Sequence, residues 1–212
     1  MDFEADRLQM VARQIEGRGI REPRVLAAMR MVPRHRFVSD SLRSEAYGDH
    51  PLSIGEGQTI SQPYMVAAMT EALMLRGSEK VLEVGTGSGY QAAILADLAE
   101  QVISIERLAT LAEQARARLA EVGITNVQVV VGDGTQGWPD RAPYDAILVT
   151  AGAPSAPAPL LDQLAPGGTL VVPVGDRHGQ ILEIHHRLPS GRVEVQRHTP
   201  CRFVDLIGEH GW

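Results

Sequence analysis

The sequence is poor in cysteine, in lysine and in long apolar runs, and each of these shortages excludes a class of protein. Cys201 is the only cysteine among 212 residues, so no disulfide can form within one chain and no metal site can rest on several thiolates. No stretch reaches the ~18 uninterrupted apolar residues that a membrane helix needs. Lys80 is the only lysine, and the residues around it are not a glycine-rich phosphate cradle, which excludes a P-loop nucleoside triphosphatase.

Charge and composition describe a globular chain with an acidic excess. The net charge of −6 argues against a nucleic acid as the main partner, because binding to a phosphate backbone rests on a basic surface. The first residues, Met1 to Asp6, are acidic and polar, so they predict neither a signal peptide nor a transit peptide. We therefore expect a cytoplasmic protein with no membrane partner, and we expect it to be a monomer.

The first third of the chain predicts helices separated by a long loop. Apolar residues at helical spacing predict two helices between Arg7 and Met31, the second of which ends at Pro33. The stretch from Arg34 to Pro63 is rich in Gly, Ser and Pro, and we expect it to be mostly loop. A loop of this length inside a compact domain is more often functional than idle. Helical spacing returns from Pro63 to Leu75.

Strands and helices then alternate along the chain. The expected strands span 81–84, 102–105, 127–131, 145–149 and 169–174, and the expected helices span 90–98, 108–122 and 159–164, with a turn at Pro166-Gly167-Gly168. Alternation of this kind predicts right-handed crossovers and a mainly parallel sheet.

The pattern changes near the end of the chain. Residues 181–187 and 192–197 predict an antiparallel hairpin, and a last strand is expected near 203–207. The sequence therefore predicts a single α/β domain, 1–212, with a doubly wound, Rossmann-like sheet. Within it we expect an N-terminal helical extension (1–76), a cofactor-binding core (77–180) and C-terminal antiparallel strands (181–212).

A glycine-rich turn follows the first strand of the core. The segment 81–90 reads Val-Leu-Glu-Val-Gly-Thr-Gly-Ser-Gly-Tyr, in which a buried strand leads into three glycines and then a helix. Glycines let the backbone approach a ligand, and a helix N-terminus offers free N–H groups. The spacing differs from the dinucleotide fingerprint, and Glu83 precedes the first glycine. Because an acid there repels a pyrophosphate and suits a cation, the turn favours S-adenosylmethionine.

Acidic residues also end the next two strands. Glu106 follows the glycines by about 20 residues, the position at which an acid binds both ribose hydroxyls in a doubly wound nucleotide site. Asp133-Gly134 ends the strand after that, and we expect the carboxylate to accept a hydrogen bond from an adenine amino group. A single strand-end acid is more often a helix cap. Three acids in register with a glycine turn predict a cofactor site at the carboxyl edge of the sheet.

Several motifs together resemble one family, the protein-L-isoaspartate O-methyltransferases. The loop Thr59-Ile60-Ser61-Gln62-Pro63 is the discriminating motif, because the glycine turn alone is shared by many methyltransferases. The chain departs from the family at Asp205, where the resemblance predicts a proline. The other matching motifs are Arg34-His35-Arg36-Phe37-Val38, Gly132-Asp133-Gly134, Ala142-Pro143-Tyr144-Asp145-Ala146-Ile147, Pro166-Gly167-Gly168 and Arg202-Phe203-Val204.

The resemblance implies a fold, a reaction and a set of site residues. It implies an S-adenosylmethionine-dependent methyltransferase fold and methyl transfer to the α-carboxylate of L-isoaspartyl residues, and also of D-aspartyl residues, in damaged proteins and peptides. It places Ser61 at the catalytic position and implies no metal. The positions that it assigns to the cofactor, which leaves as S-adenosylhomocysteine, are Thr59, Ile60, Glu83, Gly85, Thr86, Gly87, Glu106, Asp133 and Gly134.

Three other functions stay open on the sequence alone. A nicotinamide-dependent oxidoreductase shares the sheet, although the glycine spacing and Glu83 count against it. A methyltransferase acting on RNA or on a small molecule shares the cofactor half and differs only in the Ser61 loop and the N-terminal segment. A cofactor-binding protein without catalysis is the third. We expect Cys201 to be a packing residue, and His185 and His186 cannot bind one metal because neighbours on a strand face opposite ways.

Overall fold

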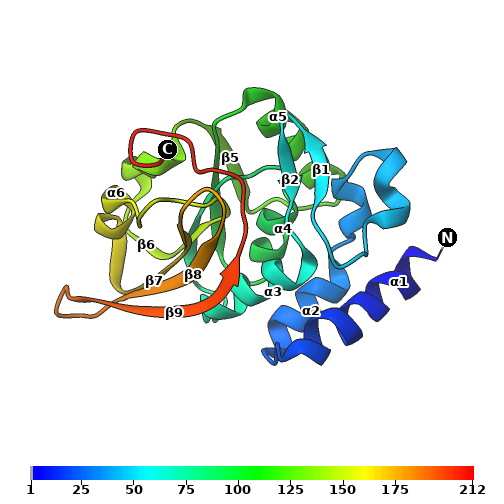
Figure 1. Cartoon of the computed structure of the whole chain (residues 1–212), viewed down its shortest axis with the longest axis horizontal. Helices are drawn as coiled ribbons and strands as arrows, with labels where there is room; N and C mark the ends of the chain where they lie inside the picture. The colour runs from blue at the N-terminus through cyan, green and yellow to red at the C-terminus, as the bar shows by residue number, and fades with distance from the viewer. Residues whose placement is uncertain (1) are drawn as a thin grey trace.

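The computed structural model describes residues 2–212, and a seven-stranded sheet forms its centre (Figure 1). The strand order is β5-β4-β3-β6-β7-β8-β9, in which β3 to β7 run parallel and β8 and β9 are antiparallel. This is the predicted mixed sheet. The strands are β3 (Lys80–Val84), β4 (Gln101–Glu106), β5 (Val127–Val131), β6 (Tyr144–Val149), β7 (Leu164–Gly175), β8 (Gln180–Arg187) and β9 (Val193–Cys201).

All six predicted helices are present. The chain starts with α1, which continues into a π-helical turn (Val11–Ile15) and a 3₁₀ turn (Glu16–Arg18). None of the helices among residues 2–212 is long and apolar enough to cross a membrane. The helices are α1 (Phe3–Met10), α2 (Pro23–Met31), α3 (Pro63–Ala72), α4 (Tyr90–Ala96), α5 (Ala109–Glu121) and α6 (Ala158–Asp162). Short 3₁₀ helices cover Arg34–Phe37, Asp40–Glu45, Gly134–Gln136 and Pro139–Arg141.

Alternating side chains on the central strands supply both faces of the sheet with a core. Successive residues on a strand point to opposite faces. Val81 of β3 therefore packs with residues of α3 and α4 on one face, whereas Leu82 and Val84 pack with α6 and the end of the chain on the other. The N-terminal helices form a third apolar cluster against α4 and α5. They stand at one end of the molecule in Figure 1.

The long loop predicted between Arg34 and Pro63 contains a small hairpin. Strands β1 (Leu52–Gly55) and β2 (Gln58–Ile60) pair antiparallel through a turn at Glu56 and Gly57. Both turn residues have positive φ, 53° and 70°, which suits the twist of a two-residue hairpin. The hairpin leads directly into Ser61 and α3, so the predicted catalytic loop has a rigid support.

Two predictions for the second half of the chain are wrong in detail. The strand expected near 203–207 is absent. Only an isolated parallel bridge between Gly152 and Asp205 marks it, because, of the described residues before it, the backbone of this segment pairs with Gly152 alone, through Val204 and Leu206. The expected turn at Pro166-Gly167-Gly168 is instead a bulge inside β7. Tyr144 of β6 pairs with Leu164, and the next pair is Ala146 with Thr169, so β7 has extra residues that loop out.

Candidate active site

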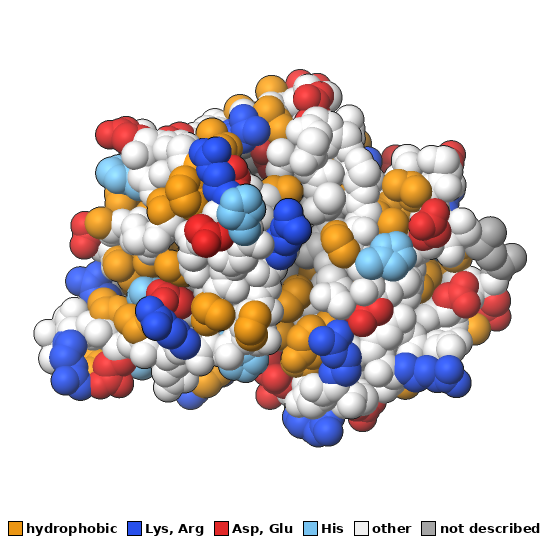
Figure 2. Space-filling model, in the orientation of Figure 1, with side chains coloured by type: hydrophobic (Ala, Val, Ile, Leu, Met, Phe, Trp, Pro, Cys, Tyr) orange, Lys and Arg blue, Asp and Glu red, His pale blue; other side chains and the backbone are white. Residues whose placement is uncertain are grey.

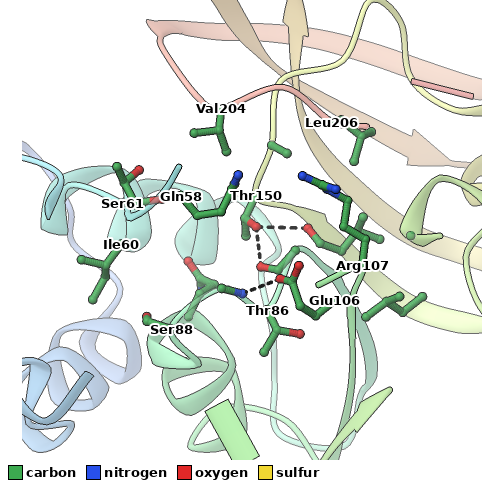
Figure 3. A pocket seen from close by; sticks show the side chains of 18 of the residues that line it. Gln58, Ile60, Ser61, Thr86, Ser88, Glu106, Arg107, Thr150, Val204 and Leu206 are labelled. Atoms are coloured by element: carbon green, nitrogen blue, oxygen red, sulfur yellow. Dashed lines mark hydrogen bonds between the residues drawn. The ribbon is translucent and has the colours of Figure 1, made fainter. Parts of the chain in front are cut away.

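A cavity lies at the carboxyl ends of the central parallel strands, where the order of connections reverses between β3 and β6. Open α/β sheets bind their ligands at this point. Figure 3 shows the cavity with Ser61 and Ile60 on one side, Thr86 and Glu106 beneath, and Val204 and Leu206 above. The predicted site residues that line it are Thr59, Ile60, Ser61, Gly85, Thr86, Gly87, Glu106 and Gly134.

The glycine turn after β3 forms one wall of the cavity. The amides of Gly85 and Thr86 both donate to the carbonyl of Ile105 on β4, at 2.8 and 3.2 Å. Gly85 has a φ of 98°, and a Cβ added to it would overlap the hydroxyl of Thr150. Only glycine fits there. Gly87, with a φ of 50°, carries the turn towards the end of β4.

Glu106 ends β4 and its carboxylate is bound by the backbone on both sides. One oxygen accepts from the amide of Gly87 at 2.9 Å and the other from the amide of Leu108 at 3.0 Å. The side chain is 6% exposed and lines the cavity. An ionised carboxylate has about four lone-pair sites, so two amide donors leave room for hydroxyl donors from a ligand. This is the placement predicted for an acid that binds ribose.

Glu83 does not line the cavity, although the sequence predicts a cofactor-binding role for it; the side chain is fully buried beneath the turn. Its partner across β4 in the parallel register is Ser104, so the two side chains share one face of the sheet, on the side of α4 and below the turn. The Ser104 hydroxyl donates to Glu83 and lies 2.5 Å from the Thr86 hydroxyl. The second carboxyl oxygen of Glu83 is buried without a partner in the described chain. Burial raises the pKa of Glu83 to about 8.

Asp133 is also absent from the lining, although its neighbour Gly134 is part of it. The carboxylate of Asp133 accepts from the amide and the hydroxyl of Thr135, at 2.9 and 2.7 Å, and from the amide of Glu209 at 2.9 Å. The carboxylate predicted to accept from adenine is therefore also bound by a segment 76 residues further along the chain. No local sequence pattern at Asp133 indicates that contact.

A second, wider cavity of about 800 Å³ opens beside the first. Ser61, Thr59, Thr150 and Val204 line both, so Ser61 stands where the two meet. The face of the molecule drawn in Figure 2 exposes apolar side chains between separated basic and acidic ones. The charged residues that line the wider cavity are Arg18, Arg177, Arg202 and Asp205.

Thr150 is the main site residue that the sequence analysis missed. It follows β6 directly, and its hydroxyl donates to the carbonyl of Gly85 at 2.6 Å. Thr150 thus ties the glycine turn to the neighbouring strand and forms part of both cavities. The signal that could have identified it is its place at the end of the strand next to β3, on the same sheet edge as the predicted strand-end acids.

Comparison with known sequences gives one consistent result over the whole chain. A family model described as Protein-L-isoaspartate(D-aspartate) O-methyltransferase (PCMT) matches residues 5–211. A protein-L-isoaspartate O-methyltransferase of Syntrophus aciditrophicus (strain SB) is 57% identical over 212 residues, covering 99% of this chain and 97% of that protein. A protein of the same name from Methanoculleus marisnigri is 57% identical over 208 residues, covering 98% of this chain and 94% of that one.

Solved structures agree with the sequence comparison. A structure titled protein-L-isoaspartate O-methyltransferase superposes with a TM-score of 0.87 at 29% identity, covering 97% of this chain and 67% of that one. A protein from Plasmodium falciparum, described as a putative protein-L-isoaspartate O-methyltransferase in complex with S-adenosyl-L-homocysteine, gives 0.83 at 25% identity over 95% of this chain and 98% of that one. The predicted methyltransferase fold is confirmed.

The raised pKa of the buried Glu83 carboxyl group predicts that the stability of the fold depends on pH. A carboxyl group whose pKa is raised from 4.5 to about 8 on folding stabilises the fold fully below pH 4.5, and that contribution is lost as the pH rises towards 8. Glu83→Gln keeps the neutral form at every pH. As the pH rises from 4.5 to 8, we expect the free energy of unfolding of the parent to fall relative to that of this variant, by up to about 1.4 kcal/mol per pH unit. Urea unfolding at pH 5 and pH 8 measures it, and parallel changes in both proteins would contradict a neutral Glu83.

Proposed function

The chain belongs to the protein-L-isoaspartate O-methyltransferase family, and from this premise we propose how its residues divide the work of the reaction. It transfers a methyl group from S-adenosylmethionine to isoaspartyl residues. We propose that the acceptor atom is an oxygen of the α-carboxylate, in damaged proteins and peptides. We extend the proposal to D-aspartyl residues, which the description of the family also names.

The first cavity fits the cofactor. When bound, S-adenosylmethionine supplies an electrophilic methyl group on a sulfonium. We assign Glu106 to the ribose hydroxyls, because its buried carboxylate is already oriented by two amides and retains free lone pairs. The turn from Gly85 to Gly87 lets the backbone come close to the cofactor. Gly134 also lines the cavity, and a Cβ there would overlap a methyl group of Val84, so glycine lets β3 and this segment approach each other at the cavity wall. Thr59 and Ile60 border the same cavity from the hairpin side.

The wider cavity fits the peptide. It is open enough for an extended segment of chain and reaches the first cavity at Ser61. An isoaspartyl linkage leaves the α-carboxylate one methylene nearer to the main chain than an aspartyl side-chain carboxylate. A peptide held in this cavity therefore brings only the isoaspartyl carboxylate to Ser61, and misplacement by about 1 Å can lower the rate by 10²-fold.

We assign Ser61 the task of holding the acceptor carboxylate. A carboxylate with a pKa near 4 is ionised at pH 7, so no general base is needed. One hydrogen bond from a neutral hydroxyl can orient an oxygen without strongly lowering its nucleophilicity. A guanidinium would stabilise the ground state too well. The single observation that carries the proposal is that Ser61 lines both cavities.

The selectivity can be measured with two peptides of one sequence that differ only in an aspartyl or isoaspartyl linkage. We expect methyl-labelled S-adenosylmethionine to label the isoaspartyl peptide alone, and mild base to release the label as methanol because the product is an ester. Equal labelling of both peptides would refute the geometric argument. Labelling of RNA but of neither peptide would place this chain's substrate in another class.

The role proposed for Ser61 predicts that its substitution lowers turnover and leaves cofactor binding unchanged. Ser61→Ala removes the hydroxyl on the acceptor side, so we expect kcat for the isoaspartyl peptide to fall about 10- to 100-fold. The affinity for S-adenosylhomocysteine should stay within about twofold, because the hydroxyl is not assigned to the cofactor. Ser78→Ala is the matched control, since Ser78 is exposed and precedes β3 at the opposite end of the strand. An unchanged kcat in Ser61→Ala would remove this residue from the mechanism.

A further inference from the structure

The last residues of the chain cross the cofactor side of the sheet. We call residues 204–212 the C-terminal strap; it follows β9 and appears in red in Figure 1. The amide of Leu206 donates to the carbonyl of Gly152 at 2.8 Å, and the indole N–H of Trp212 donates to the same carbonyl at 3.0 Å. The amide of Trp212 donates back to Leu206 at 2.8 Å. The strap is thus a closed loop held at Gly152, in the segment that follows β6.

A second attachment joins the strap to the end of β5, and Asp133 forms it. The amide of Glu209 donates to one carboxylate oxygen of Asp133 at 2.9 Å, while Thr135 supplies two bonds to the other oxygen. The amide of His210 donates to the hydroxyl of Thr135 at 3.1 Å. Burial would raise the pKa of Asp133, but the hydrogen bonds from Glu209 and Thr135 outweigh it and lower that pKa.

The strap, and not Asp133, meets the cofactor cavity. Val204, Asp205, Leu206 and Ile207 line the cavity, whereas the side chain of Asp133 does not. In Figure 3, Val204 and Leu206 lie on the side opposite Thr86 and Glu106. The strap therefore covers the cavity with residues 204–207 and binds Asp133 through the amide of Glu209.

We propose that Asp133 is a positioning residue that docks the C-terminal strap, and that the docked strap holds the cofactor in its cavity. This inference rests on the proposed cofactor site and differs from a direct hydrogen bond between Asp133 and the adenine. In the direct case Asp133 and the strap act on the cofactor independently. In the case proposed here they act as one unit.

Gly208 allows the two cases to be separated. A Cβ added at Gly208 would overlap the carboxylate oxygen of Asp133 that faces it, and would also meet the methyl group of Thr135. Gly208→Ala therefore pushes the strap away while leaving Asp133 chemically intact. Gly179→Ala is the matched control, because a Cβ at Gly179, in the nearby β7–β8 turn, meets nothing within 4 Å.

A double-mutant cycle on S-adenosylhomocysteine binding tests the proposal. We expect Asp133→Asn and Gly208→Ala each to weaken binding about 10-fold, and the double variant to be no weaker than either single one, because coupled residues give non-additive effects. Gly179→Ala should bind like the parent. Losses that multiply to about 100-fold in the double variant would overturn the proposal, and so would an unchanged affinity in Gly208→Ala.

Hydrogen exchange supplies a readout that does not depend on the cofactor. The amides of Glu209 and His210 donate to Asp133 and Thr135, so their exchange should accelerate in both single variants and stay unchanged in Gly179→Ala. Exchange at the rate of the parent in Asp133→Asn would overturn the docking role. If the parent itself fails to bind S-adenosylhomocysteine, the proposed cofactor site is refuted, while the exchange rates still decide whether Asp133 docks the strap.

Discussion

The cofactor side of this molecule depends on the bond between the Glu106 carboxylate and two backbone amides. A buried charge is costly unless it is paired or hydrogen-bonded. Gly87 and Leu108 supply the two donors, one from the turn after β3 and one from the start of α5. The same bonds fix the turn, orient the carboxylate and connect two neighbouring strand ends. The glycine turn and the Glu106 carboxylate therefore hold each other in place.

A second carboxyl group lies close to the first, and the two have different charge states. Burial raises the pKa of Glu83 to about 8; the hydrogen bond from Ser104 opposes this shift, and the negative charge of Glu106 adds to it. Glu83 is thus neutral at pH 7 and connects through Ser104 to the hydroxyl of Thr86. The wall of the cavity carries one charged acid at its surface and is supported by one neutral acid beneath it. Two ionised groups in this volume would repel each other.

Periodic patterns predicted the framework, but contacts between distant segments could not be predicted. The alternation of strands and helices, the six helices and the mixed sheet followed from the spacing of apolar residues. Glu83 and Asp133 were identified as strand-end acids, yet their surroundings depend on the strand register and on a strap from the far end of the chain. Thr150 was missed for a similar reason, because its partner Gly85 lies on another strand end. The division of the domain at residues 76/77 and 180/181 stays a prediction.

The binding role of Glu106 is the central claim, and one titration tests it. Calorimetry with S-adenosylhomocysteine should show that Glu106→Ala weakens binding by about 1.5 to 3 kcal/mol, the value of a hydrogen bond to a charged group. Glu113→Ala is the control, since Glu113 is exposed on α5 away from the cavity. Equal affinity of Glu106→Ala and the parent, with both proteins folded, would show that Glu106 only supports the backbone and does not bind the cofactor.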